Sequence, residues 1–129
     1  MLSTGTSMKV VAIGTGYVGL VTGVCYASLG HDVVCLDIDA DKIARLNAGQ
    51  SPIFEPGLEE RMAQAVDAGK LQFTTDYSSA LKDAQIAIIA VGTPTEAGGS
   101  KANTSFVEAA FTSILDHHSS TLTVVVKST

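Results

Sequence analysis

The chain has 129 residues, of which 46% are hydrophobic and 16% charged, which provides apolar material for one ordinary domain and too little length for two. Its formal net charge of -5 excludes a broad basic surface for nucleic acid or an anionic membrane. The apolar runs are far shorter than the roughly 20 residues that cross a bilayer, and the first residues lack a signal-peptide pattern. We therefore expect a soluble, cytoplasmic protein, with a disordered extension over residues 1–7 and one domain over residues 8–129.

The beginning of the chain predicts a strand, a glycine turn, a helix and a second strand. Residues 9–13 are rich in β-branched side chains and run directly into a glycine-rich turn and an apolar helical pattern that extends to Leu29. Gly30 and His31 end that helix, and residues 32–37 form the second strand pattern. These elements together make a βαβ unit.

The rest of the chain continues to alternate helices and strands. Helices are expected over residues 40–48 and 58–68, from a cap at Asp76 through Leu81, and behind Ser105 and Glu108. Strands are expected around residues 71–73 and over 85–91 and 122–127, with a polar loop over 92–102. Asp76 is a suitable N-cap, and Ser105 with Glu108 has the spacing of a capping box. The pattern predicts an open parallel sheet with the strand order 3-2-1-4-5, which is a doubly wound α/β fold of the Rossmann type.

The cysteines and histidines predict no chemistry. Cys25 falls in the first helix pattern and Cys35 in the second strand, without a CxxC partner or a neighbouring histidine. Both are expected to be small buried hydrophobes rather than a disulfide or a metal pair. His31, His117 and His118 have no second ligand or nucleophile at a useful spacing. We therefore predict no metal site and no catalytic residue.

The glycine turn carries the strongest functional signal. Residues 14–19 leave a predicted strand, open a helix and are followed about twenty residues later by Asp37 at the end of the next strand, which is the context of a dinucleotide-binding turn. Gly14 permits the tight turn, Gly16 lets a pyrophosphate approach the backbone, and Gly19 allows the helix to pack closely. The helix N-terminus then offers N–H donors to the anion. The cofactor contacts predicted in this turn are Gly14, Gly16, Tyr17, Val18 and Gly19.

Asp37 predicts which dinucleotide binds. A carboxylate at this position accepts hydrogen bonds from the ribose hydroxyls of the adenosine and repels the extra phosphate of NADP, so NAD is the expected cofactor. Lys42 is close enough in sequence to reach the same ribose or the neighbouring phosphate, although a solvated lysine on the helix surface explains it equally well. Thr93 and Thr95 follow the fourth strand and Thr129 the fifth, and all three are predicted to contact the cofactor. Their alternatives are ordinary turn chemistry and a frayed terminus.

Several stretches of the sequence are more specific than a generic nucleotide-binding fold requires. They are residues 14–20, 30–33, 37–39 with Lys42, 52–59 (Pro-Ile-Phe-Glu-Pro-Gly-Leu-Glu), 91–95 (Val-Gly-Thr-Pro-Thr) and 127–129 (Lys-Ser-Thr). Their combination resembles the UDP-glucose/GDP-mannose dehydrogenase family over nearly the whole chain from Met8. One departure is Asn103, at a position where many relatives carry aspartate, and the two residues are comparable N-caps.

The resemblance implies the activity of the whole family enzyme. That activity is two successive oxidations of the C6 alcohol of a nucleotide sugar, with UDP-glucose as the expected substrate, two NAD as oxidants and a covalent thiol intermediate. The resemblance also implies that the catalytic cysteine, the central domain and the UDP-sugar-binding domain lie beyond Thr129 in a full-length relative. We therefore expect negligible dehydrogenase activity from this chain alone, and the whole enzyme's product is expected to feed polysaccharide synthesis.

Two other interpretations stay open at this point. A dinucleotide fold also serves as a stand-alone NAD-sensing or regulatory module, and the first domain of another nucleotide-sugar or hydroxyacid dehydrogenase has the same architecture. The apolar strand over residues 122–127 favours a part of a larger enzyme, because it is expected to be poorly covered. The oligomeric state of the chain is not predicted.

Overall fold

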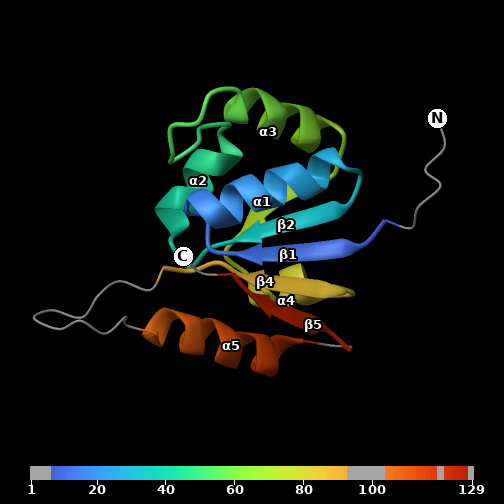
Figure 1. Cartoon of the computed structure of the whole chain (residues 1–129), viewed down its shortest axis with the longest axis vertical. Helices are drawn as coiled ribbons and strands as arrows, with labels where there is room; N and C mark the ends of the chain where they lie inside the picture. Colours follow the sequence, from blue (N-terminus) through green and yellow to red (C-terminus); the bar gives the residue numbers. More distant parts are fainter. Residues whose placement is uncertain (1–6, 93–103, 119–120, 128–129) are drawn as a thin grey trace, which may run out of the picture.

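The computed structural model describes residues 7–92, 104–118 and 121–127, which form a five-stranded parallel sheet with helices on both faces (Figure 1). The strands are β1 (Lys9–Ile13), β2 (Asp32–Leu36), β3 (Leu71–Thr74), β4 (Ile86–Ile89) and β5 (Thr123–Val126), and the helices are α1 (Tyr17–Ser28), α2 (Ala40–Asn47), α3 (Leu58–Asp67), α4 (Tyr77–Leu81) and α5 (Ser105–His117). The strand order β3-β2-β1-β4-β5 confirms the predicted order and the doubly wound fold.

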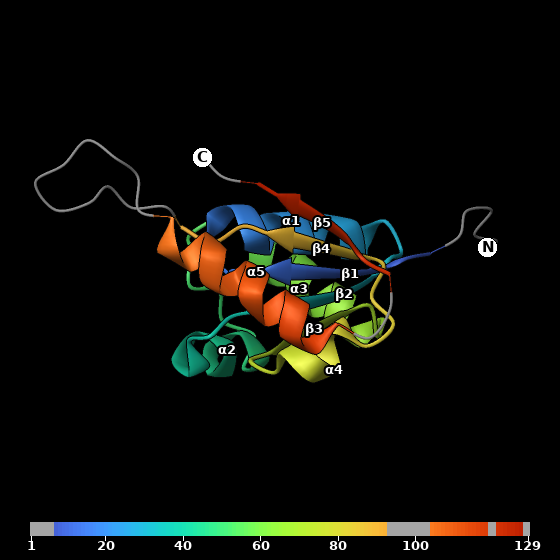
Figure 2. The same ribbon diagram turned by 90° about the horizontal axis from the view of Figure 1, so that it is seen from below.

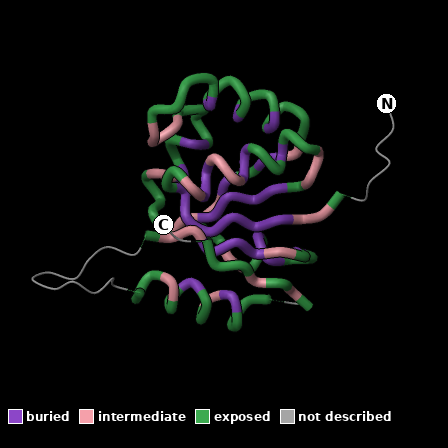
Figure 3. Tube along the Cα trace, in the orientation of Figure 1, coloured by how far each residue is buried: buried purple, intermediate pink, exposed green. Residues whose placement is uncertain are grey.

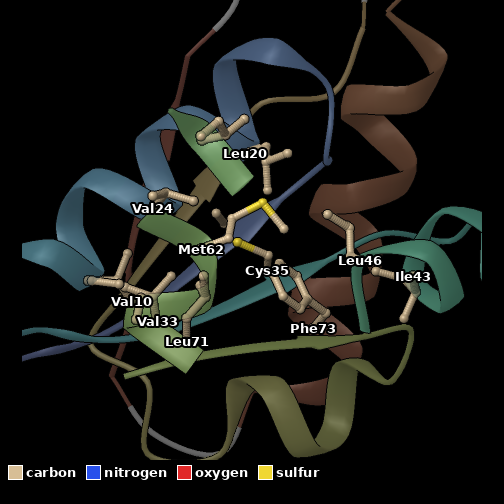
Figure 4. Packing of buried hydrophobic residues seen from close by; sticks show 14 of the residues in the cluster. Val10, Leu20, Val24, Val33, Cys35, Ile43, Leu46, Met62, Leu71 and Phe73 are labelled. Carbon is tan, nitrogen blue, oxygen red and sulfur yellow. The ribbon is translucent and has the colours of Figure 1, made fainter. Parts of the chain in front are cut away.

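The helices form one layer on each face of the sheet. Helices α1, α2 and α3 cover one face and α4 and α5 the other, as the two perpendicular views show (Figures 1 and 2). On the first face, Leu20 of α1 and Met62 of α3 pack around Cys35 of β2 (Figure 4). On the second face, Leu81 of α4 and Ile114 of α5 pack against the sheet. Because both faces of the inner strands are covered, these strands are apolar without alternation, and they are buried along most of their length (Figure 3).

The central strand β1 ends level with its two neighbours. Ile13 pairs with Leu36 of β2 and with Ile89 of β4, so the loops that follow the three strands begin at one edge of the sheet. The chain continues from β1 into α1 on one face and from β4 toward α5 on the other. The carboxyl ends of β1 and β4 therefore flank the point where the connections diverge, which is where such sheets bind ligands.

Strand β5 is much more exposed than the other strands. Val125 and Val126 are 43% and 50% exposed, and only one side of the strand, through Val124, packs against the second core cluster. This agrees with the expectation that the last apolar strand is poorly covered. Within the residues that the structure describes, no helix is long and apolar enough to span a bilayer.

The predicted capping box before α5 is wrong. Ser105 is the first helical residue, and the N-cap is Thr104, whose side chain makes no capping hydrogen bond. The Glu108 N–H donates to the backbone carbonyl of Thr104 over 3.0 Å, which is an ordinary helical bond. Ser105 is thus one position too late for its hydroxyl to act as the N-cap of a capping box. By contrast, Asp76 caps α4 as predicted, accepting from the Ser78 N–H over 3.1 Å.

The prediction that both cysteines are buried is correct for one of them. Cys35 is fully buried in β2, and burial raises the pKa of its thiol to about 12. Cys25 is exposed, because the buried side of α1 is formed by other positions, including Val24 and Ala27. The apolar character of α1 nearly all around its circumference concealed which side faces the core.

Candidate cofactor-binding site

A cavity of about 540 Å³ lies at the carboxyl ends of β1, β2 and β4. Its lining combines the glycine turn after β1, residues 36–39 at the end of β2, residues 90–92 after β4 and parts of α4 and α5. The predicted strands over residues 32–37 and 85–91 end earlier than expected, at Leu36 and Ile89. The residues that follow these two ends contribute to the lining instead of extending the sheet.

The glycine turn packs tightly where the sequence predicted it. Gly14 has a φ of +101°, and a Cβ at this residue would lie 2.8 Å from the carbonyl oxygen of Ala90. The Gly14 N–H donates to the Leu36 carbonyl over 2.7 Å, which joins the turn to β2. A Cβ at Gly19 would overlap the carbonyl oxygen of Gly14. Helix α1 therefore approaches the turn at a distance that only glycine allows at position 19.

Gly16 has a different environment from Gly14 and Gly19. It is the N-cap of α1, is exposed and lines the cavity, and a Cβ built on it has no heavy atom within 4 Å. The first N–H groups of a helix have no partner within the helix, and no side chain caps α1 at Gly16. The open space in front of Gly16 is thus a place where an anion such as a pyrophosphate can approach those N–H groups.

The Asp37 carboxylate is held in place by hydrogen bonds from the protein. Its Oδ2 accepts from the backbone N–H of Thr15 over 2.9 Å and from the Thr15 hydroxyl over 2.6 Å, and its Oδ1 accepts from the Asp39 N–H over 3.0 Å. Partial burial acts to raise the pKa of Asp37, but these hydrogen bonds and the charge of Lys42 together lower it below its ordinary value. Asp37 is therefore ionised at neutral pH.

The charges around Asp37 are mainly negative. Asp39 caps α2, accepting from the Asp41 N–H over 3.0 Å and from the Lys42 N–H over 3.2 Å, and Asp41 lies in the first turn of the same helix. The side chain of Lys42 is half-buried and lines the cavity. Two carboxylates, Asp37 and Asp39, thus line the cavity with one ammonium group, Lys42, and this balance favours hydroxyl donors over a further phosphate.

The cavity lining also contains residues that the sequence analysis did not identify. They are Tyr77 of α4, Phe106 and Ser113 of α5, and Ile38, which follows β2. Burial raises the pKa of Tyr77, a hydrogen bond with Ser113 lowers it, and the Asp37 charge raises it, with a net upward shift. Ile38 and Phe106 are 73% and 47% exposed, so they offer apolar surface to a planar ring. No local motif marks these residues, because they come from separate elements that meet only in the folded sheet.

The predicted cofactor contacts are only partly gathered in the cavity. Gly14, Gly16, Asp37 and Lys42 line it. Gly19 lies beneath the turn, whereas Tyr17 is 55% exposed at the start of α1 and Val18 is half-buried in that helix. The remaining three predictions, Thr93, Thr95 and Thr129, lie outside the described residues. Among the residues that the structure does describe, no group of three His, Cys, Asp or Glu side chains could hold a metal ion.

Comparisons with known proteins point to one family. Residues 8–129 match the model of the NAD binding domain of the UDP-glucose/GDP-mannose dehydrogenase family. The chain is 49% identical to a UDP-glucose 6-dehydrogenase of Rhizobium meliloti over 122 residues, which are 95% of this chain and 28% of that enzyme. A UDP-glucose dehydrogenase from Pyrobaculum islandicum superposes with a TM-score of 0.88 at 37% identity, covering 100% of this chain and 31% of the other. A GDP-mannose dehydrogenase from Pseudomonas aeruginosa gives a TM-score of 0.86, also at 37% identity, over 95% of this chain and 28% of the other.

Proposed function

The chain belongs to the UDP-glucose/GDP-mannose dehydrogenase family as its NAD-binding domain, and from this we propose that it serves a UDP-glucose 6-dehydrogenase, which oxidises UDP-glucose to UDP-glucuronate with two NAD. The choice of sugar rests on the relative from Rhizobium meliloti, with which the chain shares 49% identity. The chain spans 28% of the length of that enzyme. The activity therefore belongs to the whole enzyme, and this chain supplies the cofactor site.

The observation that carries the proposal is the arrangement of the glycine turn and Asp37 at two neighbouring strand ends. Gly14 and Gly16 leave room for the pyrophosphate at the N-terminus of α1. Asp37 is ionised and held by three hydrogen bonds from the protein, which supports its expected role as the acceptor for the adenosine ribose. The adenine is then expected against the exposed apolar side chains of Ile38 and Phe106, which both line the cavity. NAD, when bound, supplies the acceptor for the hydride that leaves the sugar.

The same residues account for a preference for NAD over NADP. A phosphate on the adenosine ribose would meet Asp37 and Asp39, and Lys42 is the one positively charged side chain that lines the cavity among the residues that the structure describes. A carboxylate here accepts from hydroxyl groups and repels a phosphate. The preference is thus expected to be electrostatic and to weaken at high salt.

Neither cysteine is placed to supply the thiol of the proposed reaction. Cys35 is buried in the core with a raised pKa, and Cys25 is on the surface of α1 outside the cavity. A nucleophilic cysteine needs thiolate character and access to the substrate. We therefore assign the covalent step to the part of the whole enzyme that lies outside the matched residues 8–129.

Calorimetric titration of the purified chain with NAD and NADP tests the cofactor assignment. We expect NAD to bind more tightly, and Asp37→Ala to weaken NAD binding about 10- to 150-fold, because one hydrogen bond to a charged group contributes about 1.5–3 kcal/mol. Asp67→Ala is the matched control, since Asp67 is an exposed aspartate at the end of α3, outside the cavity. An Asp37→Ala chain that binds NAD as tightly as the Asp67→Ala chain would refute the assignment.

A chimera tests the proposed enzyme. Residues 8–129 of this chain would replace the matched segment of the Rhizobium meliloti enzyme, which is 49% identical to it. The chimera is expected to reduce NAD in the presence of UDP-glucose, and the Asp37→Ala chimera to have a higher KM for NAD. A folded chimera that binds NAD but does not reduce it with UDP-glucose would contradict the proposed activity and leave the cofactor assignment intact.

A further inference from the structure

Thr15 occupies an unusual position for a polar residue. It is fully buried, and it is the only buried polar side chain among residues 7–92, 104–118 and 121–127. It stands at a variable position of the dinucleotide-binding turn, to which the motif assigns no function. Both of its donors, the backbone N–H and the hydroxyl, reach the same oxygen of Asp37, over 2.9 and 2.6 Å. Thr15 therefore links the turn after β1 to the end of β2.

The two hydrogen bonds restrict how the Asp37 side chain can rotate. One carboxylate oxygen is fixed by Thr15 and the other accepts from the Asp39 N–H over 3.0 Å. A carboxylate has about four acceptor sites, so three protein donors leave acceptor capacity for a ligand. Because the hydroxyl of Thr15 is buried, it has no competing water, and its hydrogen bond to a charged group is of the stronger kind.

We propose that Thr15 is a positioning residue, whose buried hydroxyl fixes the Asp37 carboxylate for the adenosine ribose and thereby strengthens the preference for NAD over NADP. The inference rests on the proposed function, since it concerns the same cofactor site. Thr15 acts through Asp37 and is not expected to touch the cofactor with its side chain. Without the hydroxyl, the carboxylate has more freedom and accepts less well from the ribose.

The electrostatics of the site agree with this role. The Thr15 hydroxyl is the strongest of the influences that lower the pKa of Asp37, and it counteracts the effect of partial burial. The other groups that face Asp37 are Lys42 of α2, which lowers its pKa, Tyr77 of α4, which interacts with its charge, and the neighbouring Asp39. Removing the hydroxyl is thus expected to raise the pKa of Asp37 while these groups stay in place.

The test compares Thr15→Ala with Thr15→Ser, because both lack the methyl group and differ only in the hydroxyl. Calorimetric titration with NAD and NADP is carried out on the wild-type chain and on both variants, with circular dichroism to show that each is folded. We expect Thr15→Ala to bind NAD about tenfold more weakly, because a carboxylate that is less well fixed is less well oriented to accept from the ribose, with much less change for NADP. Thr15→Ser is expected to stay close to the wild type in both affinities.

A second measurement follows the Asp37 carboxyl by carbon NMR in the ligand-free chain as the pH is lowered. The pKa of Asp37 is expected to rise in Thr15→Ala and not in Thr15→Ser. The inference is overturned if the two variants give the same NAD affinity and the same Asp37 titration. If Thr15→Ala does not fold, Thr15→Val replaces it in both measurements. A wild-type chain that fails to bind NAD would refute the proposed function instead, so the two failures are distinguishable.

Discussion

A methyl group at Gly16 is expected to weaken NAD binding without destabilising the fold. Gly16 has a φ of -75°, which L-residues adopt readily, and a Cβ there has no heavy atom within 4 Å. Alanine is therefore accommodated without strain. The lower entropy of the unfolded chain raises the free energy of unfolding by about 0.4–1 kcal/mol, and the poorer capping of α1 by alanine than by glycine offsets most of this gain. The same methyl group would stand in the open space where the pyrophosphate approaches α1.

The magnitude follows from the hydrogen bonds that the methyl group would lengthen. Loss of one backbone N–H bond to a charged phosphate corresponds to about 1.5–3 kcal/mol, or about 10- to 150-fold in the dissociation constant of NAD. The assay is calorimetric titration with NAD beside thermal unfolding followed by circular dichroism. Both are measured on the wild type, Gly16→Ala and Gly19→Ala.

Gly19→Ala is the contrasting variant, because a Cβ at that residue would overlap the Gly14 carbonyl oxygen. It is expected to lower the melting temperature, whereas Gly16→Ala is expected to leave it unchanged or slightly raised. If Gly16→Ala melts like the wild type and also binds NAD like the wild type, the pyrophosphate does not lie at the N-terminus of α1. The interpretation of the glycine turn would then be wrong.

Two further predictions concern titratable groups. Cys25 is exposed, whereas Cys35 is fully buried with a pKa raised to about 12. A chromogenic disulfide reagent near neutral pH should therefore modify one thiol of the native chain and two in urea. Two fast-reacting thiols in the native chain would contradict the buried position of Cys35. Asp37 has a folded-state pKa below the unfolded-state value of about 3.9, so it stabilises the fold above that value and loses this contribution as the pH falls through the folded-state pKa. Urea unfolding at several pH values below about 4 should therefore show that the free energy of unfolding falls more steeply with decreasing pH in the wild type than in Asp37→Asn. If the free energies of the two chains fall in parallel, the protonation of Asp37 is not linked to folding.

Local signals in the sequence account for most of the fold. The β-branched run before Gly14 predicted β1 with the bounds that the structure has, and Asp76 marked the start of α4. These signals work because a strand pattern, a glycine turn or an N-cap needs only neighbouring residues. One local signal was misleading. Ser105 was expected to cap α5, whereas the N-cap is Thr104, and only the backbone conformation distinguishes two adjacent residues that can both cap a helix.

The candidate site could be predicted only where a motif extends along the chain. The glycine turn and Asp37 belong to such a motif, whereas Tyr77 and Phe106 are brought to the cavity by α4 and α5. Their positions depend on the packing of these helices on the second face of the sheet, which no short pattern encodes. The bond between Thr15 and Asp37 has the same origin, because it requires the ends of β1 and β2 to lie side by side.

Asp37 is the residue at which stability and binding are linked. Its carboxylate is oriented by Thr15 and Asp39, so folding has already fixed the side chain and NAD need not immobilise it on binding. A change at Asp37 or Thr15 should therefore alter the stability of the ligand-free chain as well as its affinity for NAD. Gly16→Ala, whose added Cβ has no heavy atom within 4 Å, should alter the affinity for NAD with little change in stability. The contrast between these two kinds of variant tests whether the site is preorganised, because a site that becomes ordered only on binding would show no effect of Thr15 on the ligand-free chain.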